Sequence, residues 1–165
     1  MRSTKNSGFT LVELLISAIL LAILAIGFIT GNYFPSVRKG RDAVRKADLQ
    51  NIQKALELYY EDNRAYPIAN GNISLLGSPF QSGGQVYMQK LPNDPVSGKW
   101  YHYISDGTYY KLFSCIEYDG DAGPGVCQGT NVGYKSTNCG QCPPPSGNTL
   151  CKFAVVSSNT SVTCP

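Results

Sequence analysis

One acidic residue stands inside an apolar stretch, and its chemistry is the most specific in this chain. Glu13 is followed by the 21 uncharged residues from Leu14 to Phe34. A run of about 20 apolar residues is long enough to cross a bilayer as a helix. An ionised carboxylate in such a helix costs about 2.5–3.5 kcal/mol at the helix centre and less near its end. The acid therefore needs a cation as its partner, or it stays protonated.

The spacing offers a newly formed chain terminus as that partner. Cleavage between Gly8 and Phe9 would place the α-amino group of Phe9 four residues before Glu13, which is about one helical turn. The same amine could meet Glu13 of a neighbouring copy, if copies pack side by side with a small axial stagger. The other nearby cations are Arg2 and Lys5, on the far side of Gly8.

The N-terminal residues resemble the class III signal of type IV pilins and pseudopilins, through the basic Arg2 and the sequence K-N-S-G-F-T-L-V-E-L-L that begins at Lys5. In that family a membrane peptidase removes a short basic leader after Gly and N-methylates the new terminus, and an acid near that terminus is needed for assembly. The resemblance implies that Gly8 ends the leader, that Phe9 is the methylated terminus and that Glu13 is the assembly acid. An ordinary signal anchor is the simpler alternative, in which Glu13 only favours the dipole at the helix start.

A long helix must carry this acid. Beyond the apolar stretch, apolar residues recur as far as Tyr59 at steps that approximate one helical face. The pattern predicts a single helix from about Phe9 to Glu61, which would be roughly 80 Å long. We expect a transmembrane or filament-core half over residues 9–34 and an amphipathic half over residues 35–62.

Three residues of this helix bear on its flexibility and packing. Gly27 and Gly31 form a G-x-x-x-G pair, which permits close approach of helices in membranes. Pro35 predicts a bend, because proline removes a hydrogen bond from a helix interior. The glycines could instead mark a weak helical segment, as in the pilin region that can unwind on assembly, or reflect the general tolerance of membrane helices for glycine.

A basic cluster follows the apolar stretch, and Asp42 is its only acid. The cluster could be a solvated helix face, a contact for anionic lipid head groups or a surface for DNA, and we favour these in that order. The positive-inside rule would place it in the cytoplasm, but long domains cross membranes largely regardless of flanking charge. A net charge of +3 does not by itself indicate nucleic-acid binding. The cluster comprises Arg38, Lys39, Arg41, Arg45 and Lys46.

An aromatic hairpin is the clearest strand signal. The stretches Lys99–Ser105 and Thr108–Ile116 flank Asp106-Gly107, and a two-residue Asp-Gly loop is typical of β-hairpins. Residues 152–156 are expected to complete a sheet of three or four strands. The residues after Asn63 and before Leu91-Pro92 are expected to form loops with short helical turns.

The two-residue loop also predicts a register. It sets Tyr103 opposite Tyr110 and Tyr101 opposite Leu112, on a face that we expect to pack against the helix near residues 52–59. The hairpin, together with the Tyr-Pro segment and the L-P-x-D-P turn that precede it, resembles the globular part of the major pseudopilins of type II secretion. The cysteine-rich tail departs from that pattern.

All the cysteines lie in the C-terminal part of the chain, and such clustering in an exported domain predicts disulfides. Their pairing is open, because six cysteines allow 15 pairings. Cys139-Gly-Gln-Cys142 could instead be a redox motif, or join Cys127 and Cys151 in a zinc site. The candidates for disulfides are Cys115, Cys127, Cys139, Cys142, Cys151 and Cys164.

A metal ion and a catalytic site are not expected. Glu117, Asp119 and Asp121 alternate in a Gly-rich loop, whose oxygens suit calcium, and type II pseudopilins bind calcium in a comparable loop. Their spacing is a weak signal, so calcium is kept as the alternative to no metal. His102, the single histidine, has no nucleophile and acid that could complete a catalytic set with it. We therefore predict a protein that is not an enzyme and needs no cofactor.

The sequence as a whole predicts an α+β fold. A long N-terminal helix, half transmembrane and half amphipathic, packs on a small antiparallel sheet that ends in a disulfide-rich tail. Residues 1–8 form the leader, and residues 63–165 form a globular β domain.

The predicted function is that of a structural subunit of a type IV pilus-like filament. Expected partners are copies of itself in a helical homopolymer or related pilins, the membrane, prepilin peptidase and the pilus assembly platform. The protein would wait in the cytoplasmic membrane with its C-terminal domain outside the cytoplasm, then enter an extracellular filament. The alternatives are a pseudopilin of a type II secretion or DNA-uptake system, a membrane-anchored cysteine-rich redox or metal-binding module, and a tethered DNA receptor.

Overall fold

The computed structural model of the chain describes residues 8–118, 120–121, 123–127, 134–138 and 150–161. These residues form two compact units, Met1–Val37 and Arg38–Pro165. One helix, α1 (Leu11–Asn63), contributes to both units and has Pro35 inside it. The predicted helix agrees with α1 within two residues at each end, while the bend at Pro35 stays a prediction.

The two ends of α1 have local chemical causes. At the start, the Thr10 hydroxyl accepts a hydrogen bond from the Glu13 amide at 3.2 Å, which is the geometry of an N-cap. At the end, Arg64 adopts a left-handed conformation with φ of 57°, which stops helix propagation. Its amide donates to the Tyr60 carbonyl at 2.8 Å and so satisfies one of the last free carbonyls.

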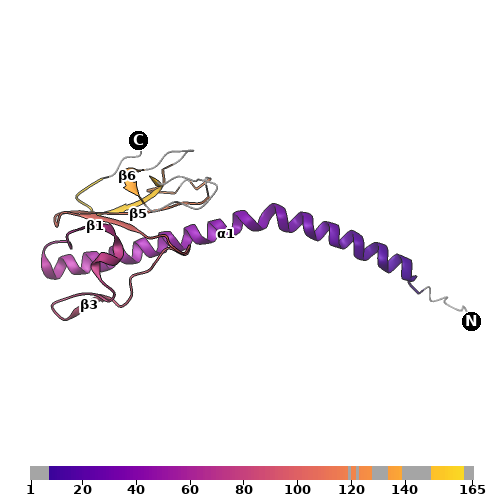
Figure 1. Cartoon of the computed structure of the whole chain (residues 1–165), viewed down its shortest axis with the longest axis horizontal. Helices are drawn as coiled ribbons and strands as arrows, with labels where there is room; N and C mark the ends of the chain where they lie inside the picture. The colour runs from indigo at the N-terminus through magenta and orange to yellow at the C-terminus, as the bar shows by residue number, and fades with distance from the viewer. Residues whose placement is uncertain (1–7, 119, 122, 128–133, 139–149, 162–165) are drawn as a thin grey trace, which may run out of the picture. The chain divides into compact units, whose positions relative to one another are not determined.

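The second unit is built on a four-stranded antiparallel sheet. The strands lie in the order β1 (Ala69–Asn72), β4 (His102–Ser105), β5 (Tyr110–Ser114) and β8 (Phe153–Val156). The C-terminal part of α1 lies along this sheet (Figure 1). The structure therefore confirms an apolar N-terminal helix and a small antiparallel sheet, in which residues 153–156 are the expected further strand.

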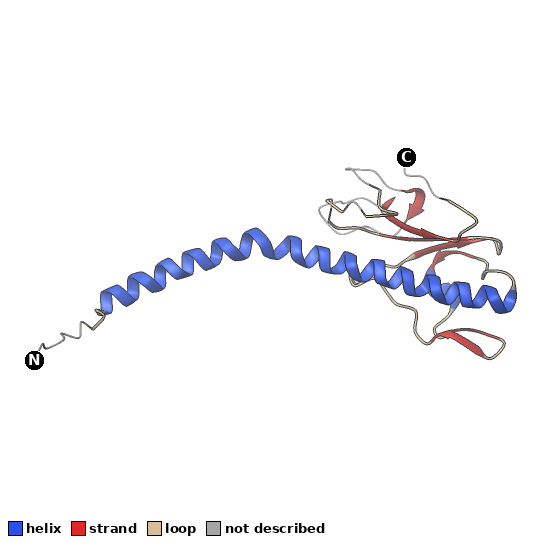
Figure 2. Cartoon of the chain, turned by 180° about the vertical axis from the view of Figure 1, so that it is seen from behind, coloured by secondary structure: helices blue, strands red, loops and turns tan. Residues whose placement is uncertain are grey.

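Smaller elements complete the described part of this unit. A 3₁₀ turn, η1 (Ile73–Leu76), follows β1. The strands β2 (Phe80–Ser82) and β3 (Gln85–Met88) form a hairpin on the side of α1 away from the sheet (Figure 2). The pair β6 (Tyr134–Asn138) and β7 (Leu150–Cys151) forms a separate two-stranded ladder.

The core lies between α1 and the sheet. Tyrosine rings fill it while their hydroxyls bond to helix carboxylates: Tyr101 donates to Asp48 at 2.6 Å, and Tyr110 donates to Glu57 at 2.8 Å. Burying a tyrosine hydroxyl is tolerated when it has such a partner. The expected core face of the hairpin is confirmed, because Tyr101, Tyr103, Tyr110 and Leu112 are all fully buried in the same core as the following helix and loop residues: Leu49, Ile52, Ala55, Leu56, Tyr66 and Ile73.

The predicted hairpin register was wrong by two residues. Tyr103 lies opposite Leu112, and Ser105 lies opposite Tyr110, so the connection has four residues. The Asp106 carboxylate explains the longer loop, since it accepts hydrogen bonds from the Thr108 amide at 2.9 Å and the Thr108 hydroxyl at 2.7 Å. Because side chains alternate with a period of two, a two-residue shift left every side chain on its predicted face.

The prediction of loops between Asn63 and Leu91 was wrong for three strands. β1 has the sequence Ala-Asn-Gly-Asn, whose low strand propensity is overridden by pairing with β4. The β2–β3 hairpin did have a local signal, because Gly83 and Gly84 both adopt positive φ values, 57° and 87°. Two such residues form the type I′ turn that suits a two-residue hairpin loop.

Candidate functional site

The predicted cleavage and assembly residues lie at the start of α1. Gly8 and Phe9 precede the helix, and Phe9 is 77% exposed. Glu13 is the acid of the first turn, where negative charge is favoured by the helix dipole. Thr10 and Glu13 have the spacing of a capping box, in which a cap hydroxyl bonds the amide three residues on. The structure does not test the pairing of Glu13 with a Phe9 amine.

A shallow groove of about 400 Å³ runs beside the acid. Ser17 faces it, and the Ser17 hydroxyl donates to the Glu13 carbonyl at 2.9 Å and to the Leu14 carbonyl at 3.0 Å. The Ser17 hydroxyl therefore has its hydrogen-bond acceptors within the helix. The Glu13 carboxylate is the charged group among the residues that line this groove. Its lining residues are Thr10, Val12, Glu13, Ile16, Ser17 and Leu20.

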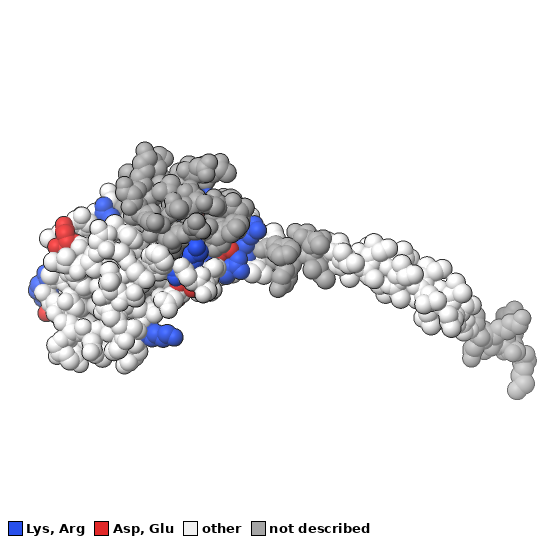
Figure 3. Space-filling model, viewed as in Figure 1, with Lys and Arg blue, Asp and Glu red and all other residues white. Residues whose placement is uncertain are grey.

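The apolar half of α1 has no cover in the described part of its own chain. The segment Leu11–Phe28 has a mean hydropathy of 2.7, none of it is buried, and it is the one described helix that is long and apolar enough to cross a membrane. Its visible face carries no charged side chain (Figure 3). Gly27 lies within it, and a Cβ added at Gly27 would meet nothing within 4 Å. Gly31 and Pro35 lie further along α1.

A second cluster of charge, which the sequence analysis missed, is centred on Arg45. This guanidinium is fully buried and forms a bidentate pair with Asp94, with Nε–Oδ2 at 2.7 Å and Nη2–Oδ1 at 2.9 Å. Its Nη1 atom also lies 2.7 Å from Asp42 Oδ1 and 2.7 Å from Glu117 Oε1. Burial alone would lower the pKa of Arg45, but these carboxylates outweigh it and raise the pKa. The group stays charged and links three segments of the chain.

Arg41 and Lys46 extend this charged network to the loop after β5. Arg41 donates to both oxygens of Glu117, with Nε–Oε1 at 2.9 Å. Lys46 Nζ lies 2.5 Å from Asp121 Oδ2. The interpretation of the basic cluster as a solvated helix face was therefore wrong for Arg45, and Arg41 and Lys46 are partly covered and paired. The pairing had no local signal in the sequence, because Asp94 of the L-P-x-D-P turn is distant in sequence from Arg45.

The candidate calcium residues are divided by this network. The carboxylates of Glu117 and Asp121 are paired with helix cations, and Asp119 lies outside the described residues. Within the described part of the chain, no group of three or more His, Cys, Asp or Glu side chains could hold a metal ion. Calcium binding by the complete set of Glu117, Asp119 and Asp121 therefore stays untested.

The described cysteines gather on the face of the sheet that points away from the core. Cys115, Cys127 and Cys151 are buried with Phe113 and Ala154, and none of these three cysteines is a free thiol. Cys139, Cys142 and Cys164 lie outside the described residues, so the disulfide pairing stays a prediction.

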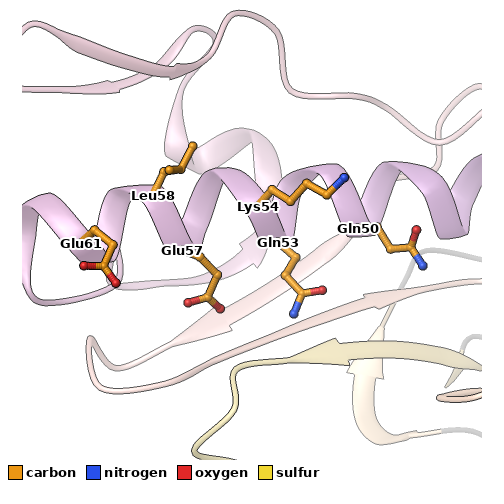
Figure 4. A pocket seen from close by; sticks show the side chains of 6 residues that line it. All are labelled: Gln50, Gln53, Lys54, Glu57, Leu58 and Glu61. Carbon is orange, nitrogen blue, oxygen red and sulfur yellow. The ribbon is translucent and has the colours of Figure 1, made fainter.

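A further groove along α1 is lined mostly by polar helix side chains. It has a volume of about 590 Å³. Both oxygens of Glu57 are occupied, because the Tyr66 hydroxyl donates to one at 2.9 Å and the Tyr110 hydroxyl to the other at 2.8 Å. Its described lining residues include no histidine, serine or cysteine. The side chains along it are Gln50, Gln53, Lys54, Glu57, Leu58 and Glu61 (Figure 4).

Two family-level matches cover most of the described chain. Residues 32–130 match the family described as type II secretion system (T2SS), protein G. Residues 3–29 match the prokaryotic N-terminal methylation motif, and this match spans Gly8, Phe9 and Glu13.

Individual relatives agree with these matches. The chain is similar to the type II secretion system core protein G of Pseudomonas aeruginosa, with 32% identity over 115 residues that cover 66% of this chain and 80% of the relative. It is similar to the protein of the same name from Aeromonas hydrophila, with 31% identity over 134 residues that cover 74% of this chain and 90% of the relative. No solved structure matches this chain.

The charged network predicts a specific acid sensitivity. Burial would raise the pKa of Glu117, but hydrogen bonds from Arg41 and Arg45 outweigh it and hold the pKa below the ordinary value of 4.5. A carboxylate with a lowered folded-state pKa stabilises the fold fully above its unfolded-state pKa, and this contribution is lost as the pH falls through the lowered value. Glu117→Gln should therefore flatten the loss of stability below pH 4.5 and cost about 3 kcal/mol at neutral pH.

Urea unfolding across acidic pH, followed by the fluorescence of Trp100, measures both effects. Glu61→Gln is the matched control, because the Glu61 side chain is 70% exposed and its ion pair with Arg64 is long, at 3.8 Å. The control should keep the native pH profile. An unchanged acid profile in Glu117→Gln would contradict the assignment.

Proposed function

Because this chain belongs to the family of type II secretion system protein G, we propose that it is a pseudopilin, a structural subunit that polymerises through its N-terminal helix. The observation that carries the proposal is the uncovered apolar segment Leu11–Phe28 with a single acid in its first turn. An apolar surface of this extent requires lipid or other protein as cover. Between the two filament types that the sequence allowed, the names of the relatives favour the filament of a secretion system.

Processing at the N-terminus follows from this proposal. Prepilin peptidase would remove residues 1–8, cutting between Gly8 and Phe9, and the new Phe9 amine would be methylated. The match of residues 3–29 to the N-terminal methylation motif supports this step. Phe9 and Gly8 precede the helix, so the scissile bond lies in a non-helical segment, which a peptidase can bind in extended form.

Before assembly, the protein would reside in the cytoplasmic membrane with its C-terminal domain outside the cytoplasm. The uncovered apolar segment supports the membrane anchor. By the positive-inside rule, the basic cluster would indicate a cytoplasmic location. This indication is weakened because Arg41, Arg45 and Lys46 are paired with carboxylates in the folded domain. The assembly platform would then move the subunit from the membrane into a filament outside it.

In the filament, helices of neighbouring copies or related pseudopilins would cover one another. Glu13 would neutralise the Phe9 amine during docking, because an unpaired charge in an apolar bundle is costly. Gly27 and Gly31 would allow close approach of helices, and Pro35 would contribute flexibility where the apolar half ends. The open space around a Cβ placed at Gly27 supports an intermolecular role for this position.

The six cysteines would form structural disulfides in an oxidising compartment. This assignment is supported by the burial of Cys115, Cys127 and Cys151 and by the absence of a free thiol among these three. These disulfides would then link the C-terminal tail covalently to the face of the sheet that points away from the core. The protein would have no redox or zinc chemistry and would not be an enzyme.

The role of Glu13 is tested by comparing two substitutions in one capping motif. Glu13→Ala should leave leader removal and membrane insertion intact but abolish incorporation into sheared filaments, because the carboxylate can no longer neutralise the Phe9 amine. Thr10→Ala removes the helix cap at a cost of about 1 kcal/mol but keeps the carboxylate, so it should assemble. Membrane fractionation, gel mobility of the processed chain and immunoblots of the filament fraction measure the three steps.

Two outcomes of that comparison would oppose the proposal. Native incorporation of Glu13→Ala would show that assembly does not need the charge. A defect of Thr10→Ala as severe as that of Glu13→Ala, with leader removal normal in both, would assign the effect to helix capping instead.

The state of the cysteines is tested by alkylation of the denatured protein without reductant. We expect no alkylated cysteine before reduction, six after reduction, and no zinc in the purified protein. Free thiols near Cys139 and Cys142, or stoichiometric zinc, would favour the redox or metal-binding alternative.

A further inference from the structure

We propose that helix α1 itself supplies the positive charge that holds the loop 117–121, in place of a bound divalent cation. The resemblance to type II pseudopilins implies calcium in a comparable loop, and the described side chains do not fit such an ion. The inference concerns the fold of this chain and does not depend on the filament function. Three observations support it. Glu117 and Asp121 are paired with helix cations, the first loop amides donate to Asp42, and Gly123 leaves room for the Lys46 ammonium group.

The Glu117 carboxylate is already saturated with cationic donors. Its side chain has 0% exposure. Oε1 receives Arg41 Nε at 2.9 Å and lies 2.7 Å from Arg45 Nη1, while Oε2 receives Arg41 Nη2. Calcium takes six to eight oxygen ligands, and two guanidinium groups on one carboxylate both occupy its lone pairs and repel a further cation.

The Asp121 carboxylate is engaged in the same way. Its Oδ2 lies 2.5 Å from Lys46 Nζ, and its Oδ1 accepts a hydrogen bond from the Gly123 amide at 3.2 Å. Gly123 also provides the room for this pair, because a Cβ there would lie 3.1 Å from Lys46 Nζ and 3.4 Å from Asp121 Oδ1. A glycine at this position thus lets the ammonium group reach the loop.

At the start of the loop, backbone amide groups donate hydrogen bonds to the helix. The Asp42 carboxylate accepts hydrogen bonds from the Glu117 amide at 3.0 and 3.1 Å and from the Tyr118 amide at 2.9 Å. Backbone carbonyls are what a calcium site uses, whereas amides pointing at a carboxylate form an anion contact. Lys39 adds a cation 4.4 Å above the Tyr118 ring. The helix side of the loop is therefore organised for ion pairs within the chain.

The pairing of charges supports the same assignment. The charged network contains the acids Asp42, Asp94, Glu117 and Asp121 and the bases Arg41, Arg45 and Lys46. Each of these four acids lies within ion-pair distance of a base of the same network, so none of them is left as an unpaired ligand for a cation. Asp119 lies outside the described residues.

The test is the thermal unfolding of the full-length protein in detergent, followed by Trp100 fluorescence with chelator or with millimolar calcium chloride. We expect the same midpoint in both. A ligand present at 100 times its Kd would raise the midpoint of a domain of this size by roughly 5–10 °C. A calcium-dependent rise of that order would overturn the proposal.

Variants of the helix cations give the second arm of the test. Arg41→Gln combined with Lys46→Gln should lower the midpoint by several degrees, because Asp121 and part of Glu117 lose their partners. Gly123→Ala should lower it to a smaller extent, because the added Cβ would crowd the Lys46 ammonium and the Asp121 carboxylate. Lys54→Gln is the matched control, since Lys54 is exposed on the same helix and forms no ion pair within the described residues, and its midpoint should stay native. A native midpoint in the first two variants would refute the proposal, even if the calcium titration were silent.

Discussion

An apolar helix that has no cover in the described part of its own chain requires lipid or other protein as cover, and this requirement separates the two halves of α1. The segment Leu11–Phe28 exposes its side chains all round, unlike the C-terminal part of α1, whose Leu49, Ile52 and Leu56 are buried under the sheet. Two environments can cover it in turn, lipid before assembly and neighbouring helices after it. In both, an ionised Glu13 would be costly without a partner, and the proposed partner in a helix bundle is the Phe9 amine.

The folded unit meets a different requirement, which is to hold a sheet firmly on the same helix. Apolar packing and tyrosine–carboxylate hydrogen bonds do this around Asp48 and Glu57. Nearer to the apolar half, the buried Arg45 replaces apolar contacts with a guanidinium shared among three carboxylates. Replacing a buried ion pair with apolar residues is often neutral for stability, whereas removing only one partner leaves a buried charge and is strongly destabilising. Along α1 the surface thus changes from apolar and uncovered in the described part of the chain to charged and then aromatic where the helix meets the folded unit.

Local sequence patterns predicted the parts of this fold that depend on local chemistry. The long helix was predicted from its periodicity, and the core face of the hairpin was predicted from alternation of Tyr101 and Tyr103. The hairpin register could not be predicted, because the Asp106 side chain stabilises a four-residue loop where Asp-Gly favours two. β1 and the pairing of Arg45 with Asp94 depend on contacts between residues far apart in the sequence, and neither has a local signal. Glu13 was recognised from the sequence because a charged side chain in an apolar helix is costly whatever the fold of the rest of the chain.

The most direct test of the central claim is the mass of the N-terminal peptide of subunits recovered from filaments. Assembly through a liberated amine predicts a peptide that begins at Phe9 and carries one added methyl group. Filaments built from subunits that still begin at Met1 would contradict the account, because their first free amine would lie eight residues before the position that Glu13 is proposed to neutralise.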